Sequence, residues 1–156
     1  MDSWYFAYGS NMSRSQMAGR TGPIRDGDEA PRVALLRGYR FGFTVRSTDN
    51  RIYANVLPSP DDVVHGVLYR CGESGMQVLD RYEAGYQRRQ VTVFDETGQQ
   101  YEATVYVSLP QCTVDAGIPT PRYRDIVLSG AREFGLPEEY VARIEELANG
   151  SFKEPR

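Results

Sequence analysis

A glutamate occupies a position where an acidic side chain is unusual, on the apolar face of a predicted helix. The helix is predicted over 74–82, and Met76, Leu79 and Glu83 follow one another at the spacing i, i+3 and i+7. If the helix continues by one residue, this spacing turns the Glu83 carboxyl inward, toward the core.

Two explanations account for an inward carboxyl at this position. The structural one is a salt bridge from Glu83 to Arg88 or Arg89, close to the end of the helix. The functional one is a general base, because desolvation raises the pKa of a carboxyl toward neutrality. Tyr82 and Tyr86 lie beside the glutamate in the sequence and would line the same inward surface.

A second stretch whose residues could take part in chemistry lies near the start of the chain. Trp4, Tyr5, Phe6 and Tyr8 are aromatic β-formers and predict a buried strand. The strand leads into a turn made of Tyr8, Gly9, Ser10, Asn11 and Met12. Ser13, with Gln16 three residues on, then has the pattern of a capping box and predicts a helix start. Such a strand–turn–helix leaves backbone N–H groups pointing at one spot, which suits a carboxylate or phosphate. An ordinary turn after a strand explains the same residues, so both alternatives stay open.

Several other chemistries are disfavoured by the sequence. It contains no Gly-Lys-Ser/Thr phosphate loop and no dinucleotide-type glycine fingerprint after a strand. Cys71 and Cys112 are too far apart for a zinc knuckle, and His65 is the single histidine, so no metal site is expected. A hydrolase built on Ser10 and His65 is the remaining nucleophilic alternative, although Ser10 is not in a Gly-x-Ser-x-Gly elbow.

Composition restricts the class of protein. The chain has 156 residues, a net charge of −3, 40% hydrophobic residues and 25% charged residues, which predicts a single globular domain that does not bind nucleic acid. We expect no membrane span, because no apolar run approaches about 20 residues. The two cysteines favour free thiols in a reducing cytoplasm. No heptad pattern or long apolar face stands out, so we expect a monomer.

Periodicity and turn residues predict the elements that would position these residues. We expect strands over 4–8, 33–36, 40–45, 52–57, 63–70, 90–95 and 101–109, and helices from 13, over 74–82, over 123–134 and over 137–148. Loops are expected over 20–31, 58–61 and 110–121, and Gly38 and Gly42 indicate bulges. This is an α+β domain over 1–150, with a mixed, mainly antiparallel curved sheet or β-barrel flanked by three to four helices, followed by a flexible tail over 151–156.

Taken together, these motifs resemble the γ-glutamylcyclotransferases. The resemblance is carried by residues 8–12, Gly66-Val67-Leu68-Tyr69, Leu79-Asp80 with Glu83, Pro121-Arg122-Tyr123, Gly130-Ala131-Arg132-Glu133 and residues 135–140. Each motif is weak by itself, but they occur in order through about residues 5 to 141, and their order and spacing are specific.

The resemblance implies a mixed β-barrel and a cofactor-free reaction that converts γ-glutamyl compounds into 5-oxoproline and a released amine. It implies that the backbone of Tyr8, Gly9, Ser10, Asn11 and Met12 binds the glutamyl α-carboxylate and that Glu83 is the acid and base. The family often has a tyrosine several residues after this glutamate. Gln90 stands at the longer spacing here, so Tyr86 is the nearer candidate for that role. Tyr123 is expected to be a wall of the pocket or a hydroxyl donor.

Substrate identity stays open at this level. The family includes members that act on γ-glutamyl amino acids, on γ-glutamyl-lysine fragments and on γ-glutamyl groups that protect antibiotic intermediates. The acidic net charge favours a cationic leaving group, such as an aminoglycoside-antibiotic intermediate. The alternative of a different class is a non-catalytic module that binds γ-glutamyl or 5-oxoproline-like ligands.

Overall fold

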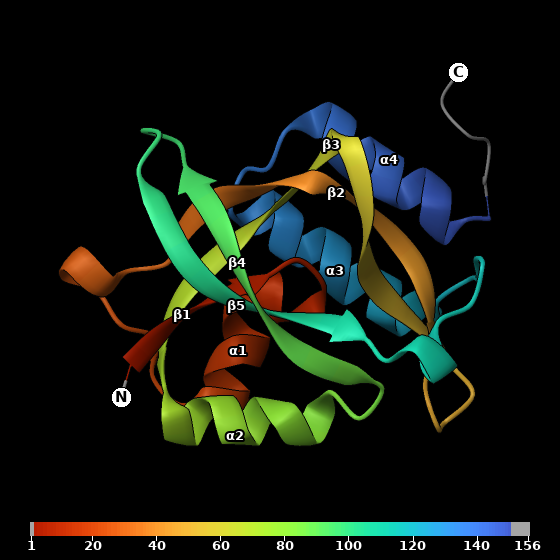
Figure 1. Cartoon of the computed structure of the whole chain (residues 1–156), viewed down its shortest axis with the longest axis horizontal. Helices are drawn as coiled ribbons and strands as arrows, with labels where there is room; N and C mark the ends of the chain where they lie inside the picture. The colour runs from red at the N-terminus through yellow and green to blue at the C-terminus, as the bar shows by residue number, and fades with distance from the viewer. Residues whose placement is uncertain (1, 151–156) are drawn as a thin grey trace.

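The computed structural model describes residues 2–150, and within them five strands close into a barrel (Figure 1). The order around the barrel is β1, β3, β2, β4 and β5. Strand β1 (Asp2–Ala7) runs antiparallel to β3 (Ile52–Gly72) and parallel to β5 (Gln100–Ser108), which closes the barrel. All other pairings are antiparallel, so the predicted mixed, mainly antiparallel β-barrel of an α+β fold is confirmed.

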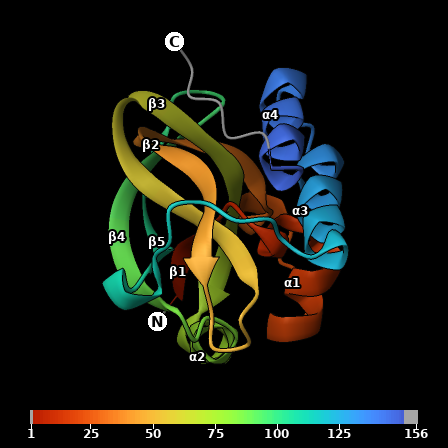
Figure 2. The same ribbon diagram turned by 90° about the vertical axis from the view of Figure 1, so that its right-hand side faces the viewer.

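Four α-helices within the described residues flank the barrel, as predicted. They are α1 (Arg14–Thr21), α2 (Glu73–Tyr82), α3 (Pro121–Glu133) and α4 (Glu138–Ala148). Figure 2 shows α1, α3 and α4 along one side of the barrel, with α2 below one end. The helix α3 packs against α4 and against the short 3-10 helix η1 (Ser10–Met12), and α1 packs against α2. None of the helices in this part of the chain combines the length and apolar character needed to cross a membrane.

The two longest strands differ from the sequence expectation. Residues 33–36 and 40–45 belong to one strand, β2 (Arg32–Arg46), and residues 52–57 and 63–70 belong to β3. The predicted bulge at Gly38 is confirmed, since its φ is 83° and the register shifts between Arg37 and Tyr39. The register shifts again after Gly42, as predicted. The stop expected at 58–61 is wrong, because β3 runs through these residues. The interruption takes the form of the register shift, since Pro58 pairs with Tyr39 and Val63 with Arg37, and prolines are tolerated at such a bulge.

Helix and hairpin boundaries also differ in places. The helix α1 continues through Thr21, into the expected loop 20–31, and α3 begins at Pro121 with Thr120 as its N-cap, because proline is favourable in the first turn. The capping box at Ser74 is wrong: α2 starts at Glu73 after Gly72, with no side-chain cap.

In the predicted hairpin, β4 (Tyr86–Asp95) starts four residues before the expected 90–95. Two short 3-10 helices, η2 (Gly27–Glu29) and η3 (Pro110–Cys112), lie in the expected loops. The expected tail over 151–156 lies outside the described residues.

The core joins the barrel to the helices. Residues 5–8 are all buried, because both faces of β1 are covered, and Met76, Leu79, Val127 and Ile144 bring the apolar faces of α2, α3 and α4 into the same cluster. This packing holds the end of β1, the turn after it and the end of α2 in fixed relative positions.

The contact between α3 and the turn depends on Gly130. A Cβ atom at this position would lie 2.6 Å from the backbone nitrogen of Ser13 and 2.8 Å from the carbonyl carbon of Met12. Backbone atoms cannot move aside as a flexible side chain can, so the turn would have to shift.

We expect Gly130→Ala to lower the free energy of unfolding by about 1–3 kcal/mol because of this overpacking. The matched control is Gly19→Ala, in the exposed interior of α1, where a Cβ meets no atom within 4 Å. That variant should gain up to about 1 kcal/mol from helix propensity. Urea unfolding of both variants measures the difference, and equal stabilities would contradict the close contact.

Candidate active site

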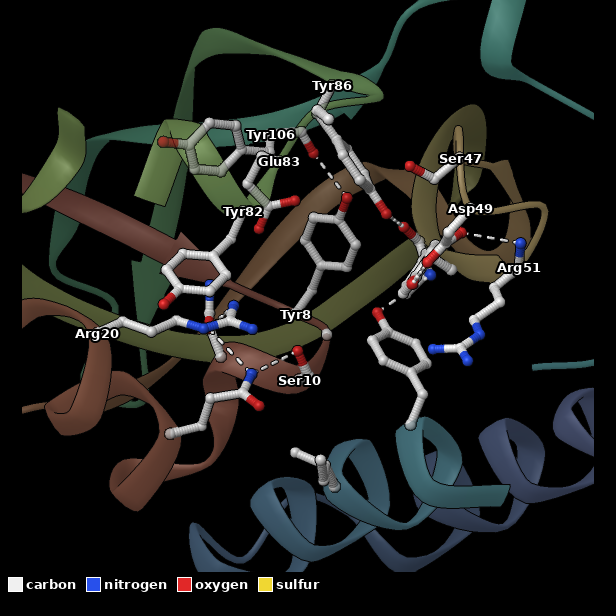
Figure 3. Close-up of a pocket in the computed structure, with 18 of the residues that line it drawn as sticks. Tyr8, Ser10, Arg20, Ser47, Asp49, Arg51, Tyr82, Glu83, Tyr86 and Tyr106 are labelled. Carbon is white, nitrogen blue, oxygen red and sulfur yellow. Dashed lines mark hydrogen bonds between the residues drawn. The ribbon is translucent and has the colours of Figure 1, made fainter. Parts of the chain in front are cut away.

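A cavity of about 410 Å³ opens where the turn after β1, the end of α2, the start of α3 and the loop between β2 and β3 meet (Figure 3). Seven of the residues predicted from the sequence line it: Tyr8, Gly9, Ser10, Asn11, Glu83, Tyr86 and Tyr123. Met12 is the predicted residue that the fold does not bring to the cavity. Its side chain is fully buried, and its N–H donates to the Gly9 carbonyl at 3.1 Å.

The turn at residues 9–12 is short and tightly held. The N–H groups of Met12 and Ser13 donate to the carbonyls of Gly9 and Ser10, which forms η1 and leaves the preceding amides outside its internal hydrogen bonds. The predicted N-cap is confirmed, because the Ser13 hydroxyl accepts from the Gln16 N–H at 3.3 Å. The Gln16 side chain does not complete the expected capping box and donates instead to Ser10 Oγ at 2.6 Å and Asn11 Oδ1 at 3.2 Å. The turn is thereby fixed to α1.

Two small residues set the width of the cavity beside this turn. A Cβ atom on Gly9 would lie 3.1 Å from the Tyr123 hydroxyl and 3.4 Å from the Ala54 Cβ. The Ala54 backbone is itself held, because its N–H donates to the Tyr123 hydroxyl at 3.2 Å and its carbonyl accepts from the Tyr86 hydroxyl. Tyr86 from β4 and Tyr123 from α3 are therefore anchored on one residue of β3.

Glu83 directly follows the last residue of α2. Its backbone leaves the helical conformation, with φ −109° and ψ 49°, and Figure 3 shows its carboxyl pointing into the space between Tyr82 and Tyr8. Within residues 2–150, no hydrogen bond or ion pair reaches this carboxyl. The salt-bridge explanation is wrong, because Arg88 instead binds Asp80 at 2.7 Å and Glu73 at 3.0 Å, and Arg89 is exposed.

Burial has a large effect on the acidity of this group. Desolvation raises the pKa of Glu83 to about 7, with a positive charge on Arg20 opposing the shift and Asp80 adding to it. A carboxyl with this pKa is present in both protonation states near neutral pH, which is the property of a group that accepts a proton and returns it.

Arg20 is a charged residue of the site that the sequence expectation missed. One guanidinium nitrogen of Arg20 donates to Asn11 Oδ1 at 2.9 Å, and its guanidinium carbon lies 4.0 Å from the centre of the Tyr82 ring. The missed signal is helical spacing: Arg20 stands four residues after Gln16, on the same face of α1, but the residues from 20 onward had been expected to form a loop. The cavity thus holds one cation close to the amide turn.

The tyrosine hydroxyls around the cavity are neutral donors and acceptors. The Tyr8 hydroxyl donates to the Tyr106 carbonyl at 2.6 Å, and the Tyr5 hydroxyl accepts from Asn11 Nδ2 at 3.1 Å. Burial raises the pKa of Tyr8 and that of Tyr86 well above the usual value, so neither is ionised near neutrality. Gln90 does not line the cavity, since its side chain donates to Thr104 Oγ1 at 2.8 Å. Of the two alternatives, the fold therefore brings Tyr86 to the site.

The hydrolase hypothesis fails on geometry. Ser10 lines the cavity and its hydroxyl accepts from Gln16, whereas the ring of His65 packs 4.7 Å from the ring of Tyr140 on α4 and lies outside the cavity. In the described part of the chain, no group of three or more His, Cys, Asp or Glu residues is arranged to hold a metal ion.

Comparison with known proteins agrees with this geometry. The profile of the AIG2-like family matches residues 63–144. The chain is 28% identical over 164 residues to a γ-glutamylcyclotransferase of Bos taurus, covering 96% of this chain and 80% of the relative. It is 28% identical over 153 residues to the one of Homo sapiens, covering 92% and 77%. A solved γ-glutamyl cyclotransferase superposes with a TM-score of 0.82 at 25% identity, covering 100% of this chain and 94% of that one. These matches confirm the resemblance drawn from the motifs.

The pKa of Glu83 predicts a pH-dependent cost to stability. Between about pH 4.5 and 7 the folded protein retains a proton on Glu83 that the unfolded chain has released, so this group lowers stability as the pH rises. Glu83→Gln removes the cost. The variant should match the wild type near pH 4.5 and be more stable by up to about 3 kcal/mol at about pH 8. Urea unfolding at the two pH values measures this. The same difference in free energy of unfolding between variant and wild type at both pH values would exclude desolvation as the cause of the raised pKa.

Proposed function

The chain belongs to the AIG2-like family, and we propose that it is a γ-glutamylcyclotransferase, which closes a γ-glutamyl group into 5-oxoproline and releases an amine. The observation that carries the proposal is the Glu83 carboxyl, which has no hydrogen-bond or ion-pair partner within residues 2–150, has a pKa of about 7 and shares one cavity with Gly9, Ser10 and Asn11 of the turn. A base and an anion site are the two elements that this reaction requires.

In the proposed reaction, the α-amine nitrogen of the substrate attacks its own γ-carbonyl carbon. The new carbon–nitrogen bond closes a five-membered ring while the amide bond to the leaving amine breaks. Glu83 accepts the proton lost by the attacking nitrogen and returns it to the leaving nitrogen, so atoms and charge balance without any co-reactant. Free α-amino groups titrate at about 7.7–8.0, close to the pKa of Glu83, so the proton transfer from the substrate ammonium to Glu83 that frees the amine for attack is nearly balanced in energy.

Ring closure is intramolecular, and the main contribution of the protein is to hold the substrate in the attacking conformation. Well-oriented intramolecular reactions gain roughly 7–11 kcal/mol over a bimolecular reference. We assign the substrate α-carboxylate to the amides of residues 9–11 and to the Arg20 guanidinium, because both favour an anion there. The α-amine would then lie on the side of Glu83.

The two anchored tyrosines receive different roles. The Tyr86 hydroxyl donates its hydrogen bond to the Ala54 carbonyl, so we assign Tyr86 to the wall of the pocket. The Tyr123 hydroxyl accepts from the Ala54 N–H and keeps its own proton for another acceptor. We assign this proton to the γ-carbonyl oxygen, where negative charge develops during the attack.

Replacing Glu83 by Gln should abolish turnover while preserving ligand binding, because the amide fills the same space but cannot shuttle a proton. We expect kcat to fall by about 10²–10⁴-fold, measured as 5-oxoproline formed from γ-glutamyl-alanine. Glu96→Gln, in the exposed turn between β4 and β5, is the matched control and should keep full activity. Near-normal turnover by Glu83→Gln would refute the proposal, and 5-oxoproline binding without turnover by the wild type would favour a binding module.

The charge of Arg20 should be visible in the pH dependence of kcat/KM. The rate should rise with pH as Glu83 loses its proton, and Arg20 lowers the pKa of Glu83. In Arg20→Gln, the pH range over which kcat/KM rises (the rising limb) should therefore move to higher pH. In Arg89→Gln, an exposed position on β4, it should stay in place. The substrate amine titrates identically in all three enzymes. A limb that is unchanged or moves to lower pH in Arg20→Gln would contradict this assignment.

A further inference from the structure

Tyr5 is a buried titratable residue to which the proposed reaction assigns no role. It lies within β1, is 4% exposed and lines the cavity. The inner end of the cavity is the part that holds the turn at residues 9–11, Arg20 and Glu83 (left in Figure 3). The hydrogen bond between Asn11 of this turn and the Tyr5 hydroxyl places the hydroxyl at the inner end.

The side-chain amide of Asn11 has one possible orientation. Its Oδ1 accepts from an Arg20 guanidinium nitrogen at 2.9 Å and from Gln16 Nε2 at 3.2 Å. A guanidinium group carries donors only, so the atom of Asn11 that faces Arg20 must be the oxygen. The other atom of the amide, Nδ2, is therefore the one that lies 3.1 Å from the Tyr5 hydroxyl.

This orientation determines how the Tyr5 hydroxyl is used. An amide nitrogen only donates, so Asn11 donates and the Tyr5 oxygen accepts. The hydroxyl hydrogen of Tyr5 is left over, and within residues 2–150 no hydrogen bond uses it. Burial, together with the negative charge of Glu83, raises the pKa of Tyr5 well above the usual value, so this hydrogen stays on the oxygen near neutral pH. A buried donor without an acceptor costs free energy until a bound group accepts from it.

Tyr8 and Tyr86 differ from Tyr5 in this respect, although both line the same cavity. The Tyr8 hydroxyl donates to the Tyr106 carbonyl at 2.6 Å, and the Tyr86 hydroxyl donates to the Ala54 carbonyl. Removing either hydroxyl would break a contact within the chain. At Tyr5 the unused donor indicates a role toward a bound ligand.

The surroundings of this donor favour an anion as its acceptor. Arg20 contacts the same Asn11 amide as Tyr5, so its positive charge acts at the same place. No hydrogen bond within residues 2–150 joins Tyr5 to Glu83. Of the γ-glutamyl groups, the α-ammonium has no lone pair with which to accept, and the γ-carbonyl oxygen is assigned to Tyr123. The α-carboxylate is the acceptor that remains.

Resting on the proposed function, we infer that the Tyr5 hydroxyl binds the α-carboxylate of the γ-glutamyl group, next to Arg20 and the turn amides. Asn11 positions the hydroxyl, because its amide takes a donor from Arg20 on one side and gives one to Tyr5 on the other. Tyr5 takes no part in the bonds that form and break, and its hydrogen stays on its oxygen. It holds the end of the substrate that carries the attacking amine.

The test compares the binding of 5-oxoproline and 5-oxoprolinamide, which share the ring and differ in whether they carry the carboxylate or a neutral amide. Calorimetry on the wild type should show tighter binding of the acid. Tyr5→Phe keeps the ring, which packs edge-on against Tyr106, and removes only the hydroxyl. It should weaken binding of 5-oxoproline by about 10–100-fold and of the amide by about 2–10-fold, since hydrogen bonds to charged groups are stronger. The preference for the acid then falls by about 5–10-fold.

Tyr69→Phe is the matched control. Tyr69 on β3 is also buried, its hydroxyl donates to the Met12 carbonyl at 2.8 Å, and it lies outside the cavity. This variant therefore removes a buried hydroxyl that supports the same turn but reaches no ligand. It should keep the wild-type ratio of the two dissociation constants even where urea unfolding shows lower stability. A ratio that Tyr5→Phe leaves unchanged, or that falls equally in both variants, would overturn the role of Tyr5.

Turnover by the wild type separates this inference from the proposed function. Failure to form 5-oxoproline from γ-glutamyl-alanine refutes the cyclotransferase activity, while a preference for the acid that is lost in Tyr5→Phe still supports the carboxylate contact. Turnover together with an unchanged preference in Tyr5→Phe supports the activity and overturns the contact. Equal binding of the acid and the amide by the wild type, or no binding of either, overturns the contact whether or not the enzyme is active.

Discussion

At Glu83 the site depends on a half-buried carboxyl that no hydrogen bond or ion pair within residues 2–150 reaches, and ionising such a group costs stability. The helix α2 ends one residue before it, and the nearby Arg88 is occupied by Asp80 and Glu73. Desolvation is the largest influence on Glu83 and brings its pKa to about 7. Arg20 moderates the shift without forming an ion pair. The arrangement sacrifices stability for a group that can exchange protons near neutral pH.

The barrel and the helices supply the rigidity that such a group requires. The turn at residues 9–12 is held from α1 by Gln16 and from α3 by the close approach at Gly130, while Ala54 is held from two sides by tyrosines. The contacts at Gly130 and Ala54 join segments that are far apart in the sequence, whereas the Gln16 contact is local. The inner end of the cavity is therefore formed before any ligand arrives, which lowers the entropy that binding must offset.

The sequence predicted the parts of the site that depend on local pattern. The strand–turn–helix at the N-terminus follows from aromatic β-formers, Gly9 and the Ser13 cap. Glu83 lines the cavity as expected, but the expected reason is wrong, because α2 ends at Tyr82 and the backbone of Glu83 has left the helical conformation. Arg20 was missed because the Gly, Asp and Pro residues over 20–31 indicate a loop, although α1 continues through Thr21. The anchoring of Ala54 could not be predicted, since it depends on how distant strands meet when the barrel closes.

The contact between Gly9 and Ala54 also restricts how the chain can change in evolution. A Cβ atom on Gly9 would lie only 3.4 Å from the Ala54 Cβ and 3.1 Å from the Tyr123 hydroxyl. A larger side chain at position 9 or 54 would fill the part of the cavity beside the turn. Restoring that space would require a simultaneous change at Tyr123 on α3. We therefore expect the residues at 9, 54 and 123 to vary together among related sequences, as one inherited unit spanning a turn, a strand and a helix.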